Sequence, residues 1–94
     1  MSVIYKGTVG LKLSFESTNS LAGASVVRIY ARKPSGTTLA WNGTVELDRY
    51  ITYVTQDGDL DEAGEWVMQP YVESGGWKGR GQAVSVPIYD DFEY

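Results

Sequence analysis

Hydrophobic and polar residues alternate along most of this chain, so that apolar side chains recur at every second position. The first clear segment spans residues 9–15, and its apolar positions are Val9, Leu11, Leu13 and Phe15. Successive side chains of a β-strand point to opposite faces, whereas a helix repeats its apolar positions every three or four residues. The pattern therefore predicts half-buried strands, and no segment shows sustained helical spacing.

The same pattern predicts further strands joined by short turns. We expect strands at residues 25–33, 37–47, 50–55 and 64–73, and a last strand that is broken at Gly79 and Gly81 and resumes at residues 82–89. Turns rich in glycine and proline at residues 34–36 and 74–76 separate some of these strands. Leu21 is expected to fold back from its loop into the core.

The segment 37–47 has two interpretations. Its apolar positions share one face: Leu39, Trp41, Val45 and Leu47. Because this phase is kept across Gly43, we favour one strand with a bulge or kink at the glycine. Asn42-Gly43 is also a strong signal for a two-residue hairpin, which is the alternative.

Two prolines fall inside predicted strands. Proline has no backbone N–H to donate to a sheet. We therefore expect Pro70 and Pro87 to lie at a sheet edge or a bulge.

Residues 57–66 combine an acidic turn with a glycine placed two residues before a large aromatic, Trp66. The rear strands of immunoglobulin-like sandwiches often begin in this way. Together with six to seven short strands, this predicts an all-β, immunoglobulin-like antiparallel β-sandwich, with a small β-barrel as the alternative. We expect one domain over residues 1–94, with residues 89–94 as a frayed acidic tail.

Composition removes several classes of function. The 94 residues contain no cysteine and no histidine and carry a net charge of −4. These absences exclude disulfides and thiolate metal sites and remove the commonest general base. The negative charge argues against a nucleic-acid partner. The first residues lack the pattern of a signal peptide, and no stretch approaches the ~20 apolar residues of a membrane span. We expect no membrane association and folding in a cytoplasm.

The acidic turn offers a candidate calcium site. Asp57, Asp59 and Asp61 place a carboxylate at every second position, and Ca²⁺ binds several such oxygens. The match to an EF-hand loop is poor, because Glu62 stands where glycine is needed and Met68 where a bidentate glutamate is needed. We favour a solvated turn whose aspartates cap their own backbone, and we expect no cofactor.

The tryptophans divide into two kinds. Trp41 and Trp66 share the phase of the core positions, so we expect both to be buried with the indole N–H bonded to a backbone carbonyl. Trp77 lies among glycines and is expected to be exposed.

The charged strand faces offer a second candidate surface. A basic stripe is predicted from Arg28, Arg32 and Lys33, with Lys78 and Arg80 adding charge. The wet face of any half-buried strand also carries such residues. The side chains that we expect to contact a partner are Trp77, Tyr71, Tyr89, Arg28 and Arg32. No enzyme is expected, because no histidine is present to activate a serine and no two carboxylates are placed as a pair across a cleft.

Two segments carry a resemblance to a known group of proteins. The turn RKPSGT, followed by Trp41, and the loop GDLDEAGEW resemble short uncharacterised proteins encoded by tailed bacteriophages and prophages. With the neighbouring strands, the resemblance spans residues 8–88. Residues 62–66 also resemble the D-x-G-x-Y corner of immunoglobulin domains, with Trp66 in place of the tyrosine and Met68 in place of the second disulfide cysteine.

The resemblance implies a non-enzymatic structural or assembly protein of a phage particle, associated with the tail, neck or baseplate. Its expected partners are other virion proteins or further copies of itself, and its expected location is the virion, or the host cytoplasm before assembly. One alternative is a glycan-binding module for host-surface attachment, with Trp77 and either Tyr71 or Tyr89 as its platform. The other is a host cytoplasmic domain that binds a partner protein.

Overall fold

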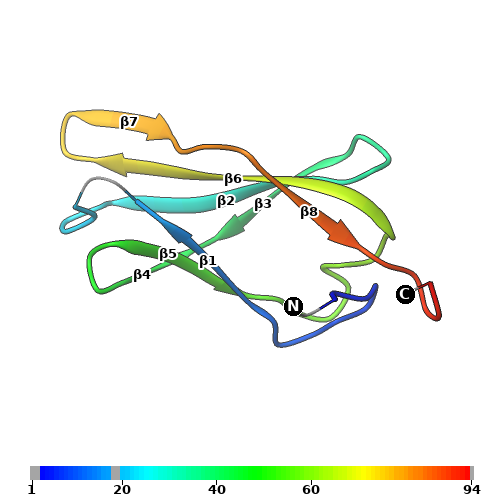
Figure 1. Cartoon of the computed structure of the whole chain (residues 1–94). Coiled ribbons are helices and arrows are strands. Elements are labelled where there is room, and N and C mark those ends of the chain that lie inside the picture. Colours follow the sequence, from blue (N-terminus) through cyan, green and yellow to red (C-terminus); the bar gives the residue numbers. More distant parts are fainter. Residues whose placement is uncertain (1–2, 18–19, 94) are drawn as a thin grey trace.

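The computed structural model describes residues 3–17 and 20–93. These residues form eight β-strands and no helix, arranged as two antiparallel sheets that face each other (Figure 1). The all-β sandwich is therefore confirmed, and the small closed barrel is not formed. The described residues contain no helix long and apolar enough to cross a membrane.

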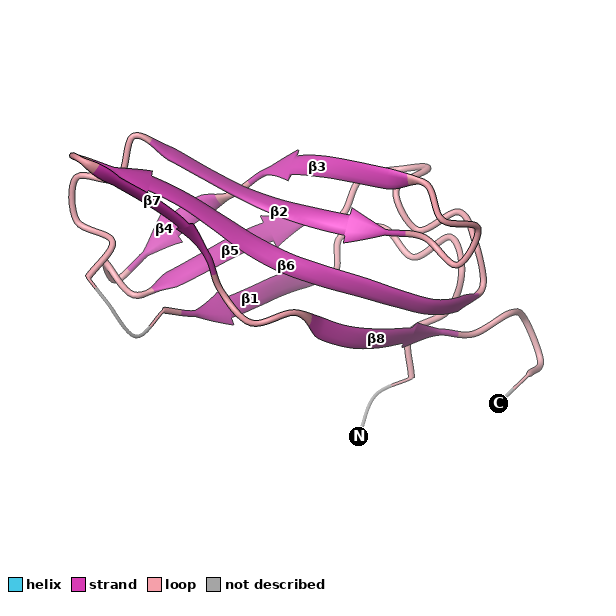
Figure 2. Cartoon of the chain, turned by 90° about the horizontal axis from the view of Figure 1, so that it is seen from above, coloured by secondary structure: helices cyan, strands magenta, loops and turns pink. Residues whose placement is uncertain are grey.

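The strands divide unequally between the two sheets. The smaller sheet has the order β1 (Lys12–Glu16), β5 (Tyr50–Val54), β4 (Thr44–Glu46). The larger sheet has the order β3 (Thr38–Asn42), β2 (Val26–Arg32), β6 (Gly64–Ser74), with β7 (Trp77–Arg80) and β8 (Val84–Ile88) both paired to β6. Seen from above, β3 lies along one edge of the larger sheet, and β7 and β8 lie along the other (Figure 2).

The core lies between the sheets and is built from alternate positions of the strands. On β6, Trp66, Met68 and Val72 are buried, as predicted, while Gln69 and Tyr71 face outward and are half-buried. Leu21 is buried in the same core, which confirms that its loop folds back. The remaining buried apolar residues are Ile29, Ala31, Trp41, Ile51, Leu60, Pro70 and Ile88.

An aromatic stack forms the centre of this core. Trp66 is fully buried, and its indole N–H donates to the Glu62 carbonyl at 3.0 Å, as predicted. The Trp66 ring lies 6.3 Å from that of Trp41, which in turn stacks on Tyr53 at 4.9 Å. Trp66 thus ties β6 to the acidic loop that precedes it.

Gly43 is the point where the chain passes from one sheet to the other. β3 pairs with β2 of the larger sheet, whereas β4 pairs with β5 of the smaller one. The predicted kink at Gly43 is therefore confirmed, but a single strand over residues 37–47 is wrong, and so is the hairpin. A Cβ at this position would lie only 2.8 Å from Ile51 Cγ2, so the crossing needs glycine for space.

Pro70 lies in a central strand and not at an edge, but three residues, 81–83, stand opposite Gln69 and Pro70, so the expected bulge is present. The Pro70 carbonyl accepts a hydrogen bond from the Gly81 N–H at 3.0 Å. The carbonyl and the nitrogen of a strand residue lie on the same side, so the N–H that proline lacks would have pointed toward Gly81 and not toward β2. The Gln69 side chain donates to the Gly81 carbonyl at 3.0 Å and supplies the bond that proline cannot make. Pro87 lies on the edge strand β8, as predicted.

The predicted strand ends need three corrections. Val9 precedes β1 and is exposed, because the chain turns at Gly10, where φ is 84°. Leu47 is 87% exposed, since it follows β4 in a turn where φ is 54°. Gly79 lies within β7, so the last segment breaks only over residues 81–83. This break and the crossing at Gly43 raise the six or seven predicted strands to eight.

The two ends of the described chain lie together. Tyr5 and Tyr89 form a parallel bridge, and the Lys6 ammonium pairs with Asp90 at 3.2 Å. Residues 90–93 form a turn in which the Glu93 N–H donates to the Asp90 carbonyl. Tyr94, the last residue of the predicted tail, lies outside the described residues.

Candidate binding surface

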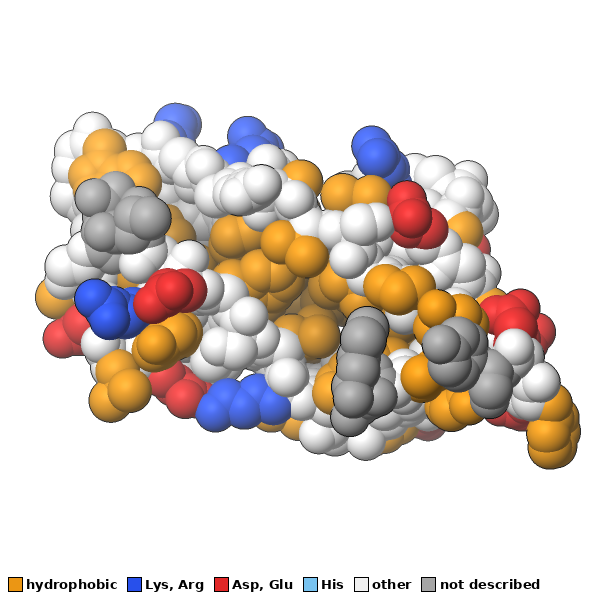
Figure 3. Space-filling model, viewed as in Figure 1, with side chains coloured by type: hydrophobic (Ala, Val, Ile, Leu, Met, Phe, Trp, Pro, Cys, Tyr) orange, Lys and Arg blue, Asp and Glu red, His pale blue; other side chains and the backbone are white. Residues whose placement is uncertain are grey.

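One long side of the sandwich is open. On this side the smaller sheet ends with β1 and the larger sheet ends with β7 and β8 (Figures 1 and 2). Figure 3 shows this side, with hydrophobic side chains visible in a hollow near the centre. We call it the open side, and it is the candidate binding surface.

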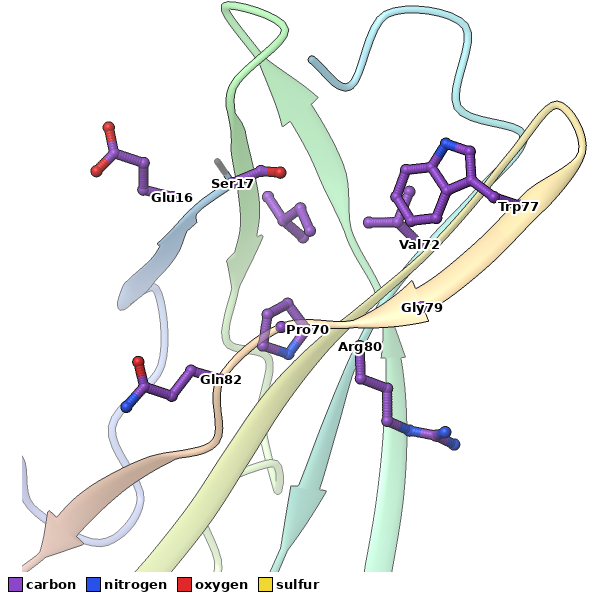
Figure 4. A pocket seen from close by; sticks show the side chains of 10 residues that line it. Glu16, Ser17, Pro70, Val72, Trp77, Gly79, Arg80 and Gln82 are labelled. Carbon is purple, nitrogen blue, oxygen red and sulfur yellow. The ribbon is translucent and has the colours of Figure 1, made fainter. Parts of the chain in front are cut away.

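The hollow on the open side measures about 270 Å³ and contains both apolar and polar groups. Its lining residues are Glu16, Ser17, Ile51, Pro70, Val72, Trp77, Gly79, Arg80, Gly81 and Gln82. The Trp77 ring lies beside Val72 at one end, and Pro70 lies farther along the hollow (Figure 4). The Arg80 side chain points away from the hollow, so the apolar groups dominate the interior (Figure 4).

Local sequence explains why the hollow forms here. Gly79 faces the same side as Val72, and a Cβ on Gly79 would lie 3.5 Å from the Trp77 ring. This is ordinary van der Waals contact, so the indole lies along the inner face of β7 directly beside Gly79. Beyond it, the buried Pro70 ring packs against Gly81, where a Cβ would lie only 2.8 Å from the ring.

The outer edge of β1 borders the hollow and exposes backbone groups. The Leu11 carbonyl accepts a hydrogen bond from the Thr55 N–H, and the Ser17 N–H donates to the Arg49 carbonyl. The backbone N–H and C=O groups of the odd-numbered residues from 11 to 17 therefore point toward β5. Alternate residues of an antiparallel strand direct their N–H and C=O groups to opposite sides. The backbone groups of Lys12, Ser14 and Glu16 therefore point outward, where no described strand pairs with them.

The side chains along this edge carry opposite charges. Lys12 pairs with Glu46 at 2.8 Å, and Glu16 lies 3.9 Å from Arg49. The hydrogen bond from Lys12 lowers the pKa of Glu46. All four side chains are largely exposed, and ion pairs of this kind contribute little stability. They leave the edge charged but balanced.

The outer face of the larger sheet carries a second cluster. Tyr30 and Tyr71 meet edge to face at 5.6 Å, and the Arg80 guanidinium lies over both rings at 5.3 and 5.4 Å. The Tyr71 hydroxyl donates to Glu73 at 2.6 Å, and this bond raises the pKa of Tyr71. Since the arginine covers both rings, neither is free to stack on a ligand without moving it.

The basic residues of β2 only partly form the predicted stripe. Arg28 and Arg32 lie on the outer face of the larger sheet, on the same side of β2 as Tyr30. Lys33 does not join them, because its ammonium lies 2.9 Å from Asp61 and 3.8 Å from Glu62.

The predicted aromatic contact residues do not form one platform. Trp77 lies on the inner face of β7, whereas Tyr71 lies on the outer face of β6. Tyr89 lies at the opposite end of the larger sheet, beside Tyr5. Trp77 is 46% exposed, which confirms its predicted exposure. Of the predicted contact residues, it is the one that lines the open side.

The carboxylates of the acidic turn do not converge on a common point. Asp59 accepts hydrogen bonds from the Tyr53 hydroxyl and from the Gln56 N–H, so it caps its own turn as predicted. Asp61 pairs with Lys33, and this hydrogen bond lowers the pKa of Asp61 and raises that of Lys33. Among residues 3–17 and 20–93, no three carboxylates are grouped to hold a metal ion. Burial and the bond to Asp59 raise the pKa of Tyr53 to about 12.

The two segments that carry the phage resemblance contact each other. Besides the Lys33–Asp61 pair, the backbone N–H and the hydroxyl of Ser35 both donate to the Glu62 carboxylate, at 3.2 and 2.9 Å. A Cβ on Gly64 would lie 2.7 Å from the Pro34 ring. Each segment therefore holds the other in place at one end of the sandwich.

No known family model matches the chain, and no curated protein matches it significantly.

Sequence reasoning missed the outer edge of β1 as a binding surface. Its signal was present in the segment KLSFE, which has apolar residues at its second and fourth positions and opposite charges at its two ends. Which edge of a strand stays unpaired depends on the strand order, which the segment itself does not encode. Ile51 and Pro70 were missed as lining residues for the same reason.

Proposed function

We propose that this chain is a non-enzymatic structural or assembly protein of a tailed-phage particle, which works by contacting other proteins. The resemblance of the RKPSGT and GDLDEAGEW segments motivates the phage assignment. The open side is the observation that carries the binding role, because it combines an unpaired strand edge with a hollow beside the half-exposed Trp77 ring. Unpaired edges add strands from a partner, and exposed apolar hollows mark contact sites.

We further propose that the sandwich is of the immunoglobulin type. The orders β1-β5-β4 and β3-β2-β6-β7 correspond to strands B-E-D and C′-C-F-G of such a domain. The Trp66 hydrogen bond to the Glu62 carbonyl corresponds to the tyrosine corner. In this correspondence residues 3–17 and 20–93 form no full first strand beside β1. The open side is the place that such a strand would cover.

The first test is mass spectrometry of phage particles that have been induced from the source strain and purified by density. We expect this chain in the particles at a stoichiometric copy number, which would also indicate its symmetry position. Its presence in the lysate but not in the particles would contradict a virion location and leave an assembly role. A genomic neighbourhood without capsid and tail genes would instead favour the host cytoplasmic alternative.

The glycan-binding alternative rests on a different surface from the one predicted. A shallow hollow of about 400 Å³ on the outer face is lined by Tyr30, Tyr71, Lys78, Gly79 and Arg80. Two cations beside two aromatic rings suit an acidic sugar. Titration with acidic cell-wall polysaccharides, followed by calorimetry, tests it. Binding that is lost in Arg80→Ala would support the alternative, and no heat with any polysaccharide would count against it.

A further inference from the structure

We propose that two copies of this chain associate by antiparallel pairing of their β1 strands, centred on Ser14. The pairing joins the two smaller sheets into one continuous sheet across a twofold axis. It deepens the proposed function, on which it rests only for the expectation that the chain works through protein contacts. It assigns a surface, the open side, and an occupant, a second copy.

The backbone phase of β1 fits this pairing. Centred on Ser14, the register sets Ser14 opposite Ser14 of the second copy and Lys12 opposite Glu16 of the second copy. All three residues direct their N–H and C=O groups outward, so each of these pairs is a hydrogen-bonded pair. A register shifted by one residue would set a residue whose N–H and C=O point outward opposite one whose N–H and C=O point toward β5, and the hydrogen bonds between the two copies would be lost.

The charges of β1 select the same register. Lys12 and Glu16 are symmetrically placed about Ser14, so a twofold axis brings each ammonium beside a carboxylate of the other copy. A shift by two residues keeps the outward-pointing backbone groups opposite each other, but it removes both contacts between Lys12 of one copy and Glu16 of the other. An edge lysine normally discourages strand addition, and here the glutamate at the symmetric position offsets it.

The core-facing side chains fit as well. In this register Leu13 lies opposite Phe15 of the second copy, on the inner side of the sheet. Both are only half-buried in the single chain. The added strand would extend the smaller sheet in front of the hollow lined by Ile51, Pro70 and Trp77. Ile51 and Pro70 are already buried in the single chain, whereas Trp77 is 46% exposed. The apolar surface that the pairing can still cover is therefore that of the half-buried Leu13 and Phe15 and of the Trp77 ring.

The existing ion pairs of the edge do not prevent the pairing. The pairs that Lys12 and Glu16 form with Glu46 and Arg49 join side chains that are 43–64% exposed. Such pairs are weak and exchange readily. Lys12 and Glu16 project on the outer face of the smaller sheet, where both can reach across to a second copy.

Sedimentation velocity of the purified full chain, from low micromolar to near-millimolar concentration, tests the pairing. We expect a reversible dimer for the natural sequence. Lys12→Glu and Glu16→Lys each set like charges against each other twice, and each should raise the dimer Kd at least about tenfold. The double variant Lys12→Glu/Glu16→Lys restores the complementarity and should dimerise like the natural chain.

Mixing the two single variants gives the sharpest result. Each alone should associate more weakly than the natural chain, but the mixture should form a heterodimer, because the acidic edge of one then faces the basic edge of the other. Lys78→Glu, on the outer face of β7, is the matched charge control and should leave the Kd unchanged. Circular dichroism of each variant checks that it is folded.

Ser14→Pro gives an independent variant that does not alter charge. It removes an N–H that points outward and leaves the bonds between β1 and β5 in place, so it should abolish the dimer. A monomer at every concentration of the natural chain would overturn the pairing. So would single charge variants that dimerise with the natural Kd, or a mixture of them that fails to associate. None of these results bears on the particle test, which measures location.

Discussion

One long side of the sandwich is closed and the other is open. On one side the chain itself crosses from β3 to β4 at Gly43 and seals the core beside Ile51. On the open side β1 ends one sheet and β7 and β8 end the other, and the hollow lies between them. Because the chain itself joins the two sheets at Gly43, their spacing on this side is fixed. An open pair of edges instead leaves apolar surface that another chain can cover.

Matched tryptophan substitutions test this comparison most strongly. Trp66 lies fully buried against Trp41 of the closed side, whereas Trp77 is about half exposed on the open side. We expect Trp66→Ala to lower the free energy of unfolding by about 3–5 kcal/mol, and Trp77→Ala by about 1 kcal/mol or less. Denaturant unfolding of both variants measures the difference. Equal losses would mean that the open side is as tightly packed as the closed side.

Matched glycine substitutions probe the crossing itself. Gly43→Ala places a Cβ against Ile51 and Val27, at 2.8 and 3.2 Å. We expect it to cost about 1–3 kcal/mol of stability through overpacking, measured by thermal or denaturant unfolding. Gly76→Ala, in the turn before β7, meets no atom within 4 Å and should leave the stability nearly unchanged. A neutral Gly43→Ala would mean that the sheets can separate at the crossing.

The hydroxyl of Tyr53 contributes to the closed side and makes it sensitive to high pH. Its pKa is raised from 10.0 to about 12 in the folded chain, first by burial and then by Asp59. The folded state therefore holds the Tyr53 proton more tightly than the unfolded state does. The protonated hydroxyl contributes its full stabilisation below pH 10, and this contribution is lost as the pH rises through about 12. Tyr53→Phe should cost about 1 kcal/mol at neutral pH and reduce the alkaline loss of stability. Asp59→Asn, which keeps the phenol, should reduce that loss less. An unchanged alkaline slope in Tyr53→Phe would contradict the assignment.

The turn between β4 and β5 is a strained point at the end of the closed side. Leu47 has a φ of 54° and is 87% exposed, a backbone conformation that asparagine adopts more easily. We expect Leu47→Asn to raise the free energy of unfolding by about 1 kcal/mol. Leu47→Ala keeps the strain and removes the exposed side chain, so it should change the stability little. A gain in the alanine variant equal to that in the asparagine variant would assign the effect to the exposed side chain instead.

The sequence by itself predicted the fold class and most of the buried positions. The alternation of Trp66, Met68 and Val72 identified the inner face of β6, and the phase of Trp41 identified its burial. Such patterns are local, because each strand needs one apolar face wherever it lies. The exposure of Trp77 and the capping role of Asp59 also followed from neighbouring residues alone.

Only the tertiary structure decided which strands become neighbours and which edges stay open. The phase of residues 37–47 is the same whether the chain continues in one sheet or crosses to the other, so the two strands at Gly43 could not be separated by pattern. Pro70 lies in a central strand because the neighbouring strand breaks beside it, a fact set by residues 81–83. Strand order depends on contacts between residues far apart in the chain. The open side, with Lys12, Ser14 and Glu16 along its edge, is a consequence of that order and not of any one segment.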